Sequence, residues 1–289
     1  MTRRTQARAR IATWLAAAAL GTAAPAIAEV HVYSMDHETG RLIKIKEDGT
    51  LIWDCPNRNG HDVQLLPGGN VLIVTGKVQE VAPDKTVVWE LGAPTIKFSE
   101  SAQRLPNGHT VIADNGKMAV IEVDRDKKEV WRYDVPNTNK RPEPTMRQVR
   151  RLENGNTLIA ASTEDEVIEV APDKTIVWRY KLPFPYLATR LPNGNTLISS
   201  GSGYGSVAGY YLVEVTPKGE VAWKYGGADA PADQRLKWPS GFVRTPDGNT
   251  YISEAQNAAI RVVAPDKTTV RVIKSPAMKH PCTLVVVDE

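Results

Sequence analysis

Three histidines are the residues of this 289-residue chain best suited to chemistry: His37, His61 and His280. An imidazole titrates near neutral pH, attacks electrophiles when neutral and binds metal ions. Grouped together, the three would support acid–base chemistry, group transfer or metal binding. No spacing motif links them, so three solvated loop histidines are the alternative. Arg147 adds a candidate anion site, with a solvated loop again as the alternative.

Further polar and aromatic residues stand in comparable loop segments. Tyr186, Trp238 and Tyr204 would form an aromatic wall or cap the core. Carboxylates and amides, among them Glu164, would serve a metal-dependent hydrolase if they converged. We predict catalytic roles for His61, His280 and Arg147, and ligand binding by His37, Asp62, Glu100, Asp114, Asn115, Tyr186, Trp238, Glu254 and Asn257. The sequence names no cofactor.

A turn motif that recurs six times indicates the scaffold that must position these loops. APDKTVVW (82–89) and APDKTIVW (171–178) are its clearest copies, and related segments begin at 46, 123, 216 and 264. The copies follow one another at intervals of 36 to 48 residues. A period of about 40 to 50 residues built from short strands is typical of a β-propeller blade. We therefore predict an all-β, six-bladed propeller of four-stranded antiparallel blades.

The strands of each repeat can be assigned in order as A, B, C and D. An Asn-Gly or Asp-Gly hairpin, as in LPNGNTLI (191–198), joins A to B because those residues tolerate the positive φ of tight turns. Alternating segments such as EVIEV (166–170) form strand C, and the strand ending in tryptophan is D. The D-to-A connections and B-to-C turns then emerge on one face, which carries all the site candidates. His109, within an A–B turn, should lie on the opposite face.

The two ends of the chain are predicted to close the ring. Residues 30–33 form a B strand with no A strand before it, and residues 283–287 form a strand with no partner after it. The C-terminal strand would supply strand A of the N-terminal blade, which removes two free sheet edges. Cys55 and Cys282 fall in this blade, so we hypothesise a disulfide between them; two free thiols are the alternative.

Five tryptophans share one position on strand D. A shared position implies a shared structural role, so we predict that they pack between adjacent blades rather than bind ligand. They are Trp53, Trp89, Trp131, Trp178 and Trp223.

Residues 1–28 are predicted to be a signal peptide. Four arginines precede an apolar run at 11–20, and the segment ends in Ala26-Ile27-Ala28, a small-x-small cleavage pattern. Its removal lowers the formal net charge from +3 to −1, so the basic precursor gives no indication of nucleic-acid binding. We expect a periplasmic or secreted monomer, with residues 29–289 forming one propeller and no membrane anchor in the mature chain.

The repeat LPNGNTLI followed by VIEVAPDKTIVWRY (167–180) resembles the blades of bacterial arylsulfotransferase-like propellers and, more loosely, PQQ-like (quinoprotein-like) repeats. GHDVQLLPGGNVLI (60–73) is the segment most similar to the former. The resemblance covers the chain from residue 29 onward. It implies transfer of a sulfuryl group between phenols through a histidine, a role that falls to His61. His280 and either Arg147 or Arg150 would assist.

Two classes of function follow from these features. The first is an exported propeller that binds a small ligand or a protein on the variable face. The second is an arylsulfotransferase-like enzyme acting on phenolic substrates through His61, and a metal-dependent lactonase-type hydrolase is a further alternative. Convergence of His61 and His280 beside an arginine would favour group transfer, and convergence of Glu254, Asn115 and Asn257 would favour a metal.

Overall fold

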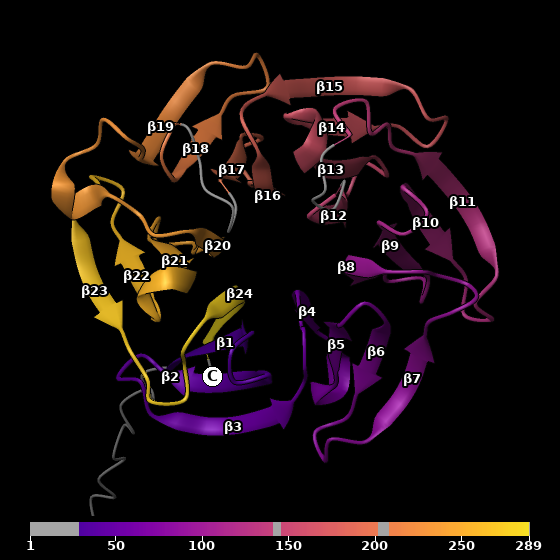
Figure 1. Ribbon diagram of the computed structural model, residues 1–289, viewed down its shortest axis with the longest axis horizontal. Coiled ribbons are helices and arrows are strands. Elements are labelled where there is room, and N and C mark those ends of the chain that lie inside the picture. The colour runs from indigo at the N-terminus through magenta and orange to yellow at the C-terminus, as the bar shows by residue number, and fades with distance from the viewer. Residues whose placement is uncertain (1–28, 141–145, 202–207, 289) are drawn as a thin grey trace, which may run out of the picture.

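Six four-stranded antiparallel sheets surround a central axis in a computed structural model of the chain (Figure 1). The structure describes residues 29–140, 146–201 and 208–288. The predicted six-bladed, all-β propeller is therefore confirmed. The predicted signal segment 1–28 lies outside the described residues. No helix within the described ranges is long and apolar enough to cross a membrane.

The blades are numbered from the N-terminal one, and strands run from the axis outward as A, B, C and D. Blade 1 consists of β24 (Pro281–Asp288), β1 (Val30–Asp36), β2 (Arg41–Lys46) and β3 (Leu51–Pro56). Blade 2 consists of β4 (Asp62–Leu65), β5 (Val71–Val74), β6 (Val78–Val81) and β7 (Val87–Leu91). Blade 3 consists of β8 (Ser99–Arg104), β9 (Thr110–Asp114), β10 (Ala119–Val123) and β11 (Glu129–Asp134).

The remaining blades follow the same order. Blade 4 consists of β12 (Gln148–Arg151), β13 (Thr157–Ala161), β14 (Glu166–Val170) and β15 (Ile176–Lys181). Blade 5 consists of β16 (Pro185–Arg190), β17 (Thr196–Ser200), β18 (Tyr211–Val215) and β19 (Val221–Gly226). Blade 6 consists of β20 (Pro239–Arg244), β21 (Thr250–Glu254), β22 (Ala259–Val263) and β23 (Thr269–Ile273). Short 3₁₀ turns occur at Pro67–Gly69, Ser162–Glu164, Ala232–Gln234 and Ala255–Asn257.

The C-terminal strand closes the ring as predicted. β24 pairs with β1 in antiparallel register, with Ser34 opposite Leu284 and Val32 opposite Val286. The described C-terminal end thus lies within the first blade, beside the strands that begin the fold (Figure 1). Because the two chain ends pair in one sheet, the first blade has four strands like the other five, and the ring is closed.

The cores lie between neighbouring blades, because each central strand is buried on both faces. β18 (Tyr211–Val215) is buried along its whole length, and β10 is buried at all positions but Glu122. Valine and isoleucine fill these strands, and their branched side chains pack well on a pleated surface. The six buried clusters each join side chains of two adjacent blades.

A repeated contact holds adjacent blades together and explains the tryptophans. The indole nitrogen of Trp178 donates to the carbonyl of Pro217 in the next blade, 3.0 Å away. Arg190 of that blade lies over the Trp178 ring and pairs with Glu169, which is opposite Trp178 in the sheet. The same glutamate–tryptophan–arginine arrangement recurs at three further seams. The predicted structural role is confirmed for these four tryptophans, and Trp53 packs against the buried cluster between blades 1 and 2.

The hypothesised disulfide is wrong. Cys55 and Cys282 are both buried free thiols. Cys55 lies on the outermost strand β3 opposite Leu42, whereas Cys282 lies on the innermost strand β24, and β1 and β2 separate them. Strands are spaced about 4.8 Å apart, so three steps exceed the roughly 7 Å limit on Cα separation for a disulfide.

Candidate functional site: a histidine mouth

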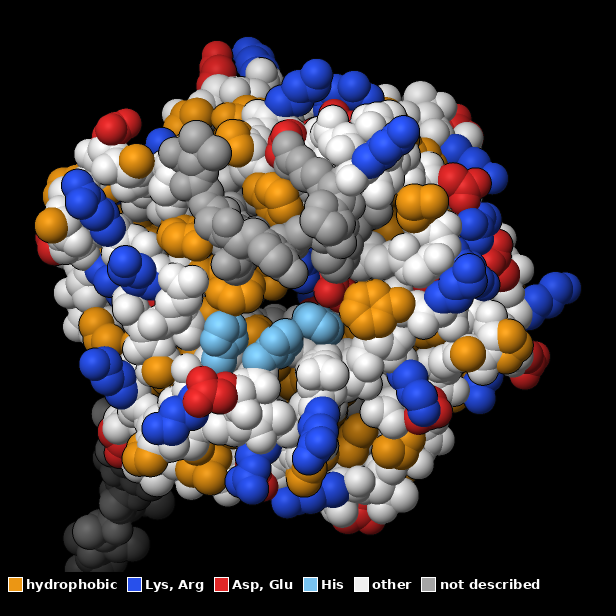
Figure 2. All heavy atoms as spheres, in the orientation of Figure 1, with side chains coloured by type: hydrophobic (Ala, Val, Ile, Leu, Met, Phe, Trp, Pro, Cys, Tyr) orange, Lys and Arg blue, Asp and Glu red, His pale blue; other side chains and the backbone are white. Residues whose placement is uncertain are grey.

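Three histidines meet at the centre of the face formed by D-to-A connections and B-to-C turns. The rings of His37 and His61 are in edge-to-face contact with centroids 4.6 Å apart, and those of His37 and His280 are stacked at 6.0 Å. Figure 2 shows histidine side chains gathered side by side at the central opening of this face. The sequence therefore placed them correctly, and the structure brings all three together.

Backbone contacts between the chain ends hold this cluster in place. The Asp36 carboxylate accepts hydrogen bonds from the backbone N–H groups of Lys279 at 2.7 Å and His280 at 2.6 Å. The backbone N–H of His37 donates to the carbonyl of His280 at 3.1 Å, and that of His61 donates to Val74 at 2.8 Å. The ring closure thus positions His37 and His280 directly, since one follows the first strand and the other precedes the last.

The surroundings of His61 and His37 favour their neutral imidazole forms. Burial, together with the nearby His37 and Arg147, lowers the pKa of His61 to about 3. Burial also lowers the pKa of His37, with His280 and Arg147 acting in the same direction and a hydrogen bond to the Gly60 backbone opposing them. A neutral imidazole keeps a lone pair for hydrogen bonding or nucleophilic attack.

A buried ion pair stands beside the histidines. Arg147 donates to Glu100 across 2.7 Å, and the other Glu100 oxygen lies 3.9 Å from Nε2 of His61. Glu100 is the extra residue of a β-bulge in β8, where Ser99 and Ser101 pair with consecutive residues of β9. Bulges re-aim side chains and are frequent beside functional sites. The bulge gives Glu100 its place at the mouth.

Aromatic side chains form one wall of the mouth. Tyr186, the extra residue of a similar bulge in β16, contacts Trp238 edge to face at 6.1 Å and lies beneath the Arg147 guanidinium at 5.0 Å. Trp238 in turn contacts His280 at 5.1 Å. On the other side, Phe98 contacts His61 at 6.3 Å and is 41% exposed. Tyr186 and Trp238 form the predicted wall, Tyr204 lies outside the described residues, and Phe98 is a member that the sequence did not indicate.

Two further features occur at the mouth, a positive φ at Trp238 and two buried nitrogens without hydrogen-bond partners. The backbone of Trp238 has a φ of +54°, a strained conformation for a bulky residue that is typical of functional sites. Nε1 of Trp238 and Nε2 of His37 are buried and have no hydrogen-bond partner within the described parts of the chain. Each such atom carries the desolvation cost of an unmade hydrogen bond.

Four other predicted ligand residues form hydrogen bonds within their own loops and do not converge on one point. Asp114 accepts hydrogen bonds from the backbone of Lys97 and Phe98, and Glu254 accepts one from Lys237 and pairs with Arg261. The other two also bond to nearby groups. Asn115 exchanges two hydrogen bonds with the Met146 backbone, and Asn257 donates one to Glu254.

The metal-site alternative receives no support from this arrangement. Asp114 lies in blade 3, Glu254 in blade 6, and Glu164 binds Thr138 near blade 4. Among the residues that the structure describes, no group of three or more His, Cys, Asp or Glu side chains is arranged to hold a metal ion.

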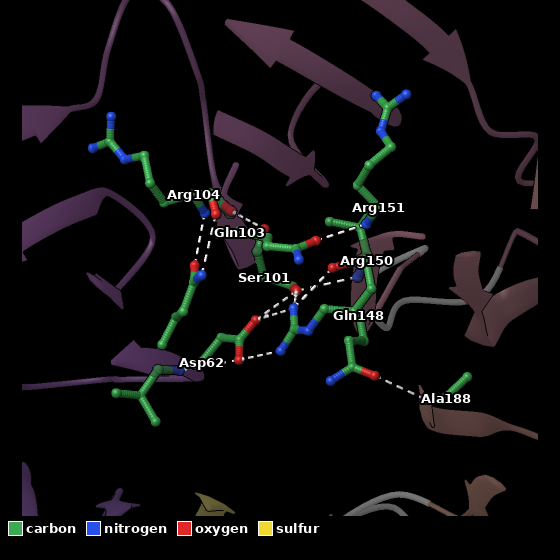
Figure 3. A network of polar contacts seen from close by, with 12 residues as sticks. Asp62, Ser101, Gln103, Arg104, Gln148, Arg150, Arg151 and Ala188 are labelled. Carbon is green, nitrogen blue, oxygen red and sulfur yellow. Dashed lines mark hydrogen bonds and ion pairs between the residues drawn. The ribbon is translucent and has the colours of Figure 1, made fainter. Parts of the chain in front are cut away.

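Asp62 lies one residue deeper along the channel than His61 and faces a different network. Arg150 forms a bidentate ion pair with it, with both nitrogen–oxygen distances 2.7 Å, and Ser101 donates to it at 2.6 Å (Figure 3). Arg150 comes from β12 and Asp62 from β4, so the pair reaches across the inner strand β8 between them. It forms the inner boundary of the histidine mouth.

Comparisons with known proteins define the fold and leave the family open. No protein-family model matches the chain, and no curated protein matches it. A protein of unknown function from Bacteroides caccae is 18% identical, with a TM-score of 0.72 over 90% of this chain and 100% of its own. Hydrazine synthase from Kuenenia stuttgartiensis is 12% identical, with a TM-score of 0.60 over 86% of this chain and 90% of that one.

An enzyme complex is also among the similar structures. A catalytically inactive histidine-to-alanine variant of virginiamycin B lyase from Staphylococcus aureus, bound to quinupristin, is 13% identical, with a TM-score of 0.56 over 88% of this chain and 78% of that one. Similarity at these levels of identity establishes the propeller fold alone.

Proposed function

We propose that the histidine mouth binds a small ligand that carries an aromatic ring and an anionic group. The observation that carries this proposal is the convergence of three imidazoles beside Arg147 and within an aromatic wall. A concave site with apolar walls and a few convergent polar groups is the usual form of a small-molecule site.

Each part of the mouth has a counterpart in such a ligand. An anionic group would pair with the Arg147 guanidinium, which also pairs with Glu100. An aromatic ring would stack against Trp238 or Phe98. Polar atoms of the ligand would satisfy the unpartnered Trp238 Nε1 and His37 Nε2.

Group transfer through His61 is the second candidate function, and the state of this histidine favours it. Its lowered pKa keeps the imidazole neutral at physiological pH. With an aryl sulfate, a ring nitrogen of His61 would attack sulfur, the S–O bond to the aryl group would break, and the phenolate would leave and take a proton from solvent. An acceptor phenol would then attack sulfur, lose its proton to solvent and break the S–N bond.

Two further features support the catalytic candidate. The blade repeats resemble those of arylsulfotransferase-like propellers, in which a histidine carries the sulfuryl group. The inactive histidine variant of virginiamycin B lyase indicates that a propeller of similar shape depends on a histidine for catalysis.

Binding is tested by titrating the protein with 4-nitrophenyl sulfate and following heat release. We expect saturable binding that weakens at least tenfold in Arg147→Met and in Trp238→Ala, because each removes one class of contact. Lys77→Ala, on an exposed loop of the same face, is the matched control and should bind as the wild type does. Unchanged affinity in both mouth variants would contradict the proposal.

Catalysis is tested separately with the same donor and a phenol acceptor. Release of 4-nitrophenolate by the wild type and its loss in His61→Ala would support group transfer. Binding without turnover would leave the ligand-binding function and remove the transfer function for this donor class.

A further inference from the structure

A second cavity, the channel cavity, occupies the central channel beyond the Arg150–Asp62 pair. Its volume is about 480 Å³, within the usual range for small-ligand sites. Val63, Gln64 and Leu65 line it, and they follow Asp62 along β4 away from the histidine mouth. The cavity therefore opens toward the face formed by the A–B hairpins, opposite the face that carries the proposed function.

The charged side chains that line the channel cavity are all basic. Arg150, Arg190 and Arg244 contribute to its wall, and none of its lining residues is Asp or Glu. Their carboxylate partners lie behind them and outside the lining: Asp62, Glu169 and Glu214. All three guanidiniums are thus already paired, and those of Arg190 and Arg244 also lie over the seam tryptophans Trp178 and Trp223.

Two glutamines add amide donors on the same side. Gln103 accepts the backbone N–H of Arg151 at 2.7 Å, and Gln148 accepts that of Ala188 at 2.9 Å. A backbone N–H can be met only by the side-chain oxygen, which fixes the orientation of each amide. Each Nε2 is then left without an acceptor among the described residues. Figure 3 shows the contacts that the two amide oxygens make.

Apart from Thr189, Arg190, Arg244 and Thr283, the opposite side of the channel cavity is apolar. β16, β20 and β24 contribute Leu187, Phe242, Val243, Leu284 and Val285. Donors from β8 and β12 therefore face an aliphatic and aromatic surface across one cavity.

An open path leads to this cavity. A groove of about 770 Å³ shares Gln103, Arg150 and Thr189 with it and continues between the hairpins around Leu152–Asn154 and Pro192–Gly194. Thr189 is exposed at this junction, and no described residue bonds its hydroxyl.

We propose that the channel cavity is a second binding site, for a small carboxylate with an aliphatic body. The carboxylate would accept hydrogen bonds from Gln103, Gln148 and Arg150, and the aliphatic chain would pack against the wall around Phe242. This site is distinct from the histidine mouth, because none of the three histidines lines the channel cavity and the Arg150–Asp62 pair lies between the two sites.

Isothermal titration of the full chain with decanoate below its micellar concentration tests the proposal. We expect saturable one-to-one binding by the wild type. Gln148→Glu and Gln103→Glu keep the oxygen that accepts the backbone N–H but replace the donor with a negative oxygen. Each should weaken decanoate binding at least tenfold while the circular dichroism spectrum and Tm stay near those of the wild type.

A steric variant and a probe of opposite charge complete the experiment. Thr189→Trp fills the junction without removing a protein contact and should abolish binding. Decyltrimethylammonium should not bind the wild type and should gain affinity in Gln148→Glu. His61→Ala and Arg147→Met alter only the mouth and should bind decanoate as the wild type does.

Three results would overturn the second site. The first is no decanoate binding by the wild type. The second is wild-type affinity for decanoate in Gln103→Glu, Gln148→Glu and Thr189→Trp. The third is loss of decanoate binding only in the two mouth variants. The last would place decanoate at the histidine mouth. Failure of 4-nitrophenyl sulfate to bind would contradict the function of the mouth and leave the channel cavity unaffected.

Discussion

Arg150 of blade 4 reaches past blade 3 to form a bidentate ion pair with Asp62 of blade 2. The Ser101 hydroxyl of the intervening β8 donates to Asp62 and accepts from Arg150, so three inner strands share one network. Asp62 is 3% exposed, and its neighbour in sequence is His61. The network therefore both joins non-adjacent blades and fixes the base of the histidine mouth.

Breaking this pair on one side should strongly destabilise the fold. Arg150→Met leaves the Asp62 carboxylate buried without its counter-ion, and we expect a loss of about 3 kcal/mol in the free energy of unfolding, measured with urea. Arg41→Met breaks the surface pair with Asp54 and should cost less than about 1 kcal/mol. Equal effects of the two variants would show that the channel network contributes no more than a surface contact.

The pH dependence of stability should report on His61. Its pKa is about 3 in the folded protein against the ordinary histidine value of 6.5, so between these values the unfolded chain binds a proton that the folded chain does not. Stability contributed by the neutral ring is complete above pH 6.5 and decreases as the pH falls toward 3. The slope reaches at most about 1.4 kcal/mol per pH unit.

His61→Gln should flatten this slope in urea unfolding measured between about pH 6.5 and 4. The groups facing the ring, His37, Arg147 and Glu100, remain in that variant. Phe98→Leu removes a ring contact but no titrating group, so its effect should be the same at every pH. An unchanged slope in His61→Gln would mean that this imidazole is protonated in the folded state.

Much of the architecture could be predicted because it depends on local pattern. Turn residues at a fixed period specify six blades, and the unpaired strands at 30–33 and 283–287 specify how the ring closes. The same order placed His37, His61 and His280 on one face. The contact between His37 and His280 depends on ring closure, because the hydrogen bond that joins Asp36 to His280 links residues 244 apart in sequence.

What the sequence could not predict depends on register and on competition for hydrogen bonds. Glu100 and Tyr186 were predicted for this face, but the β-bulges that turn their side chains toward the mouth leave no clear composition signal. Asp114 and Glu254 were predicted to bind ligand, but their carboxylates accept hydrogen bonds from backbone N–H groups of the neighbouring loops. The disulfide hypothesis failed because the first and last strands of one blade are three strand spacings apart, beyond the reach of a disulfide.

The seam contacts provide a matched pair of substitutions. Trp178 donates its indole N–H to Pro217, whereas the indole nitrogen of Trp89 is buried without a partner in the described chain. Trp178→Phe should therefore lower the free energy of unfolding by about 1 kcal/mol more than Trp89→Phe, since only the former loses a hydrogen bond. Urea unfolding of both variants at one pH makes the comparison. A larger loss in Trp89→Phe would show that ring packing, not the hydrogen bond, distinguishes the two seams.

The state of the two cysteines can be tested directly. With β1 and β2 between them, Cys55 and Cys282 should not be linked, and a reducing agent should leave Tm unchanged. Burial raises the pKa of the Cys282 thiol, with Asp36 acting in the same direction, so the reactive thiolate is disfavoured in the folded protein. Iodoacetamide should label Cys282 slowly under native conditions and both cysteines rapidly in urea without reductant. Peptide mass spectrometry under non-reducing conditions would detect a 55–282 linkage, and finding one would require a different strand arrangement in blade 1.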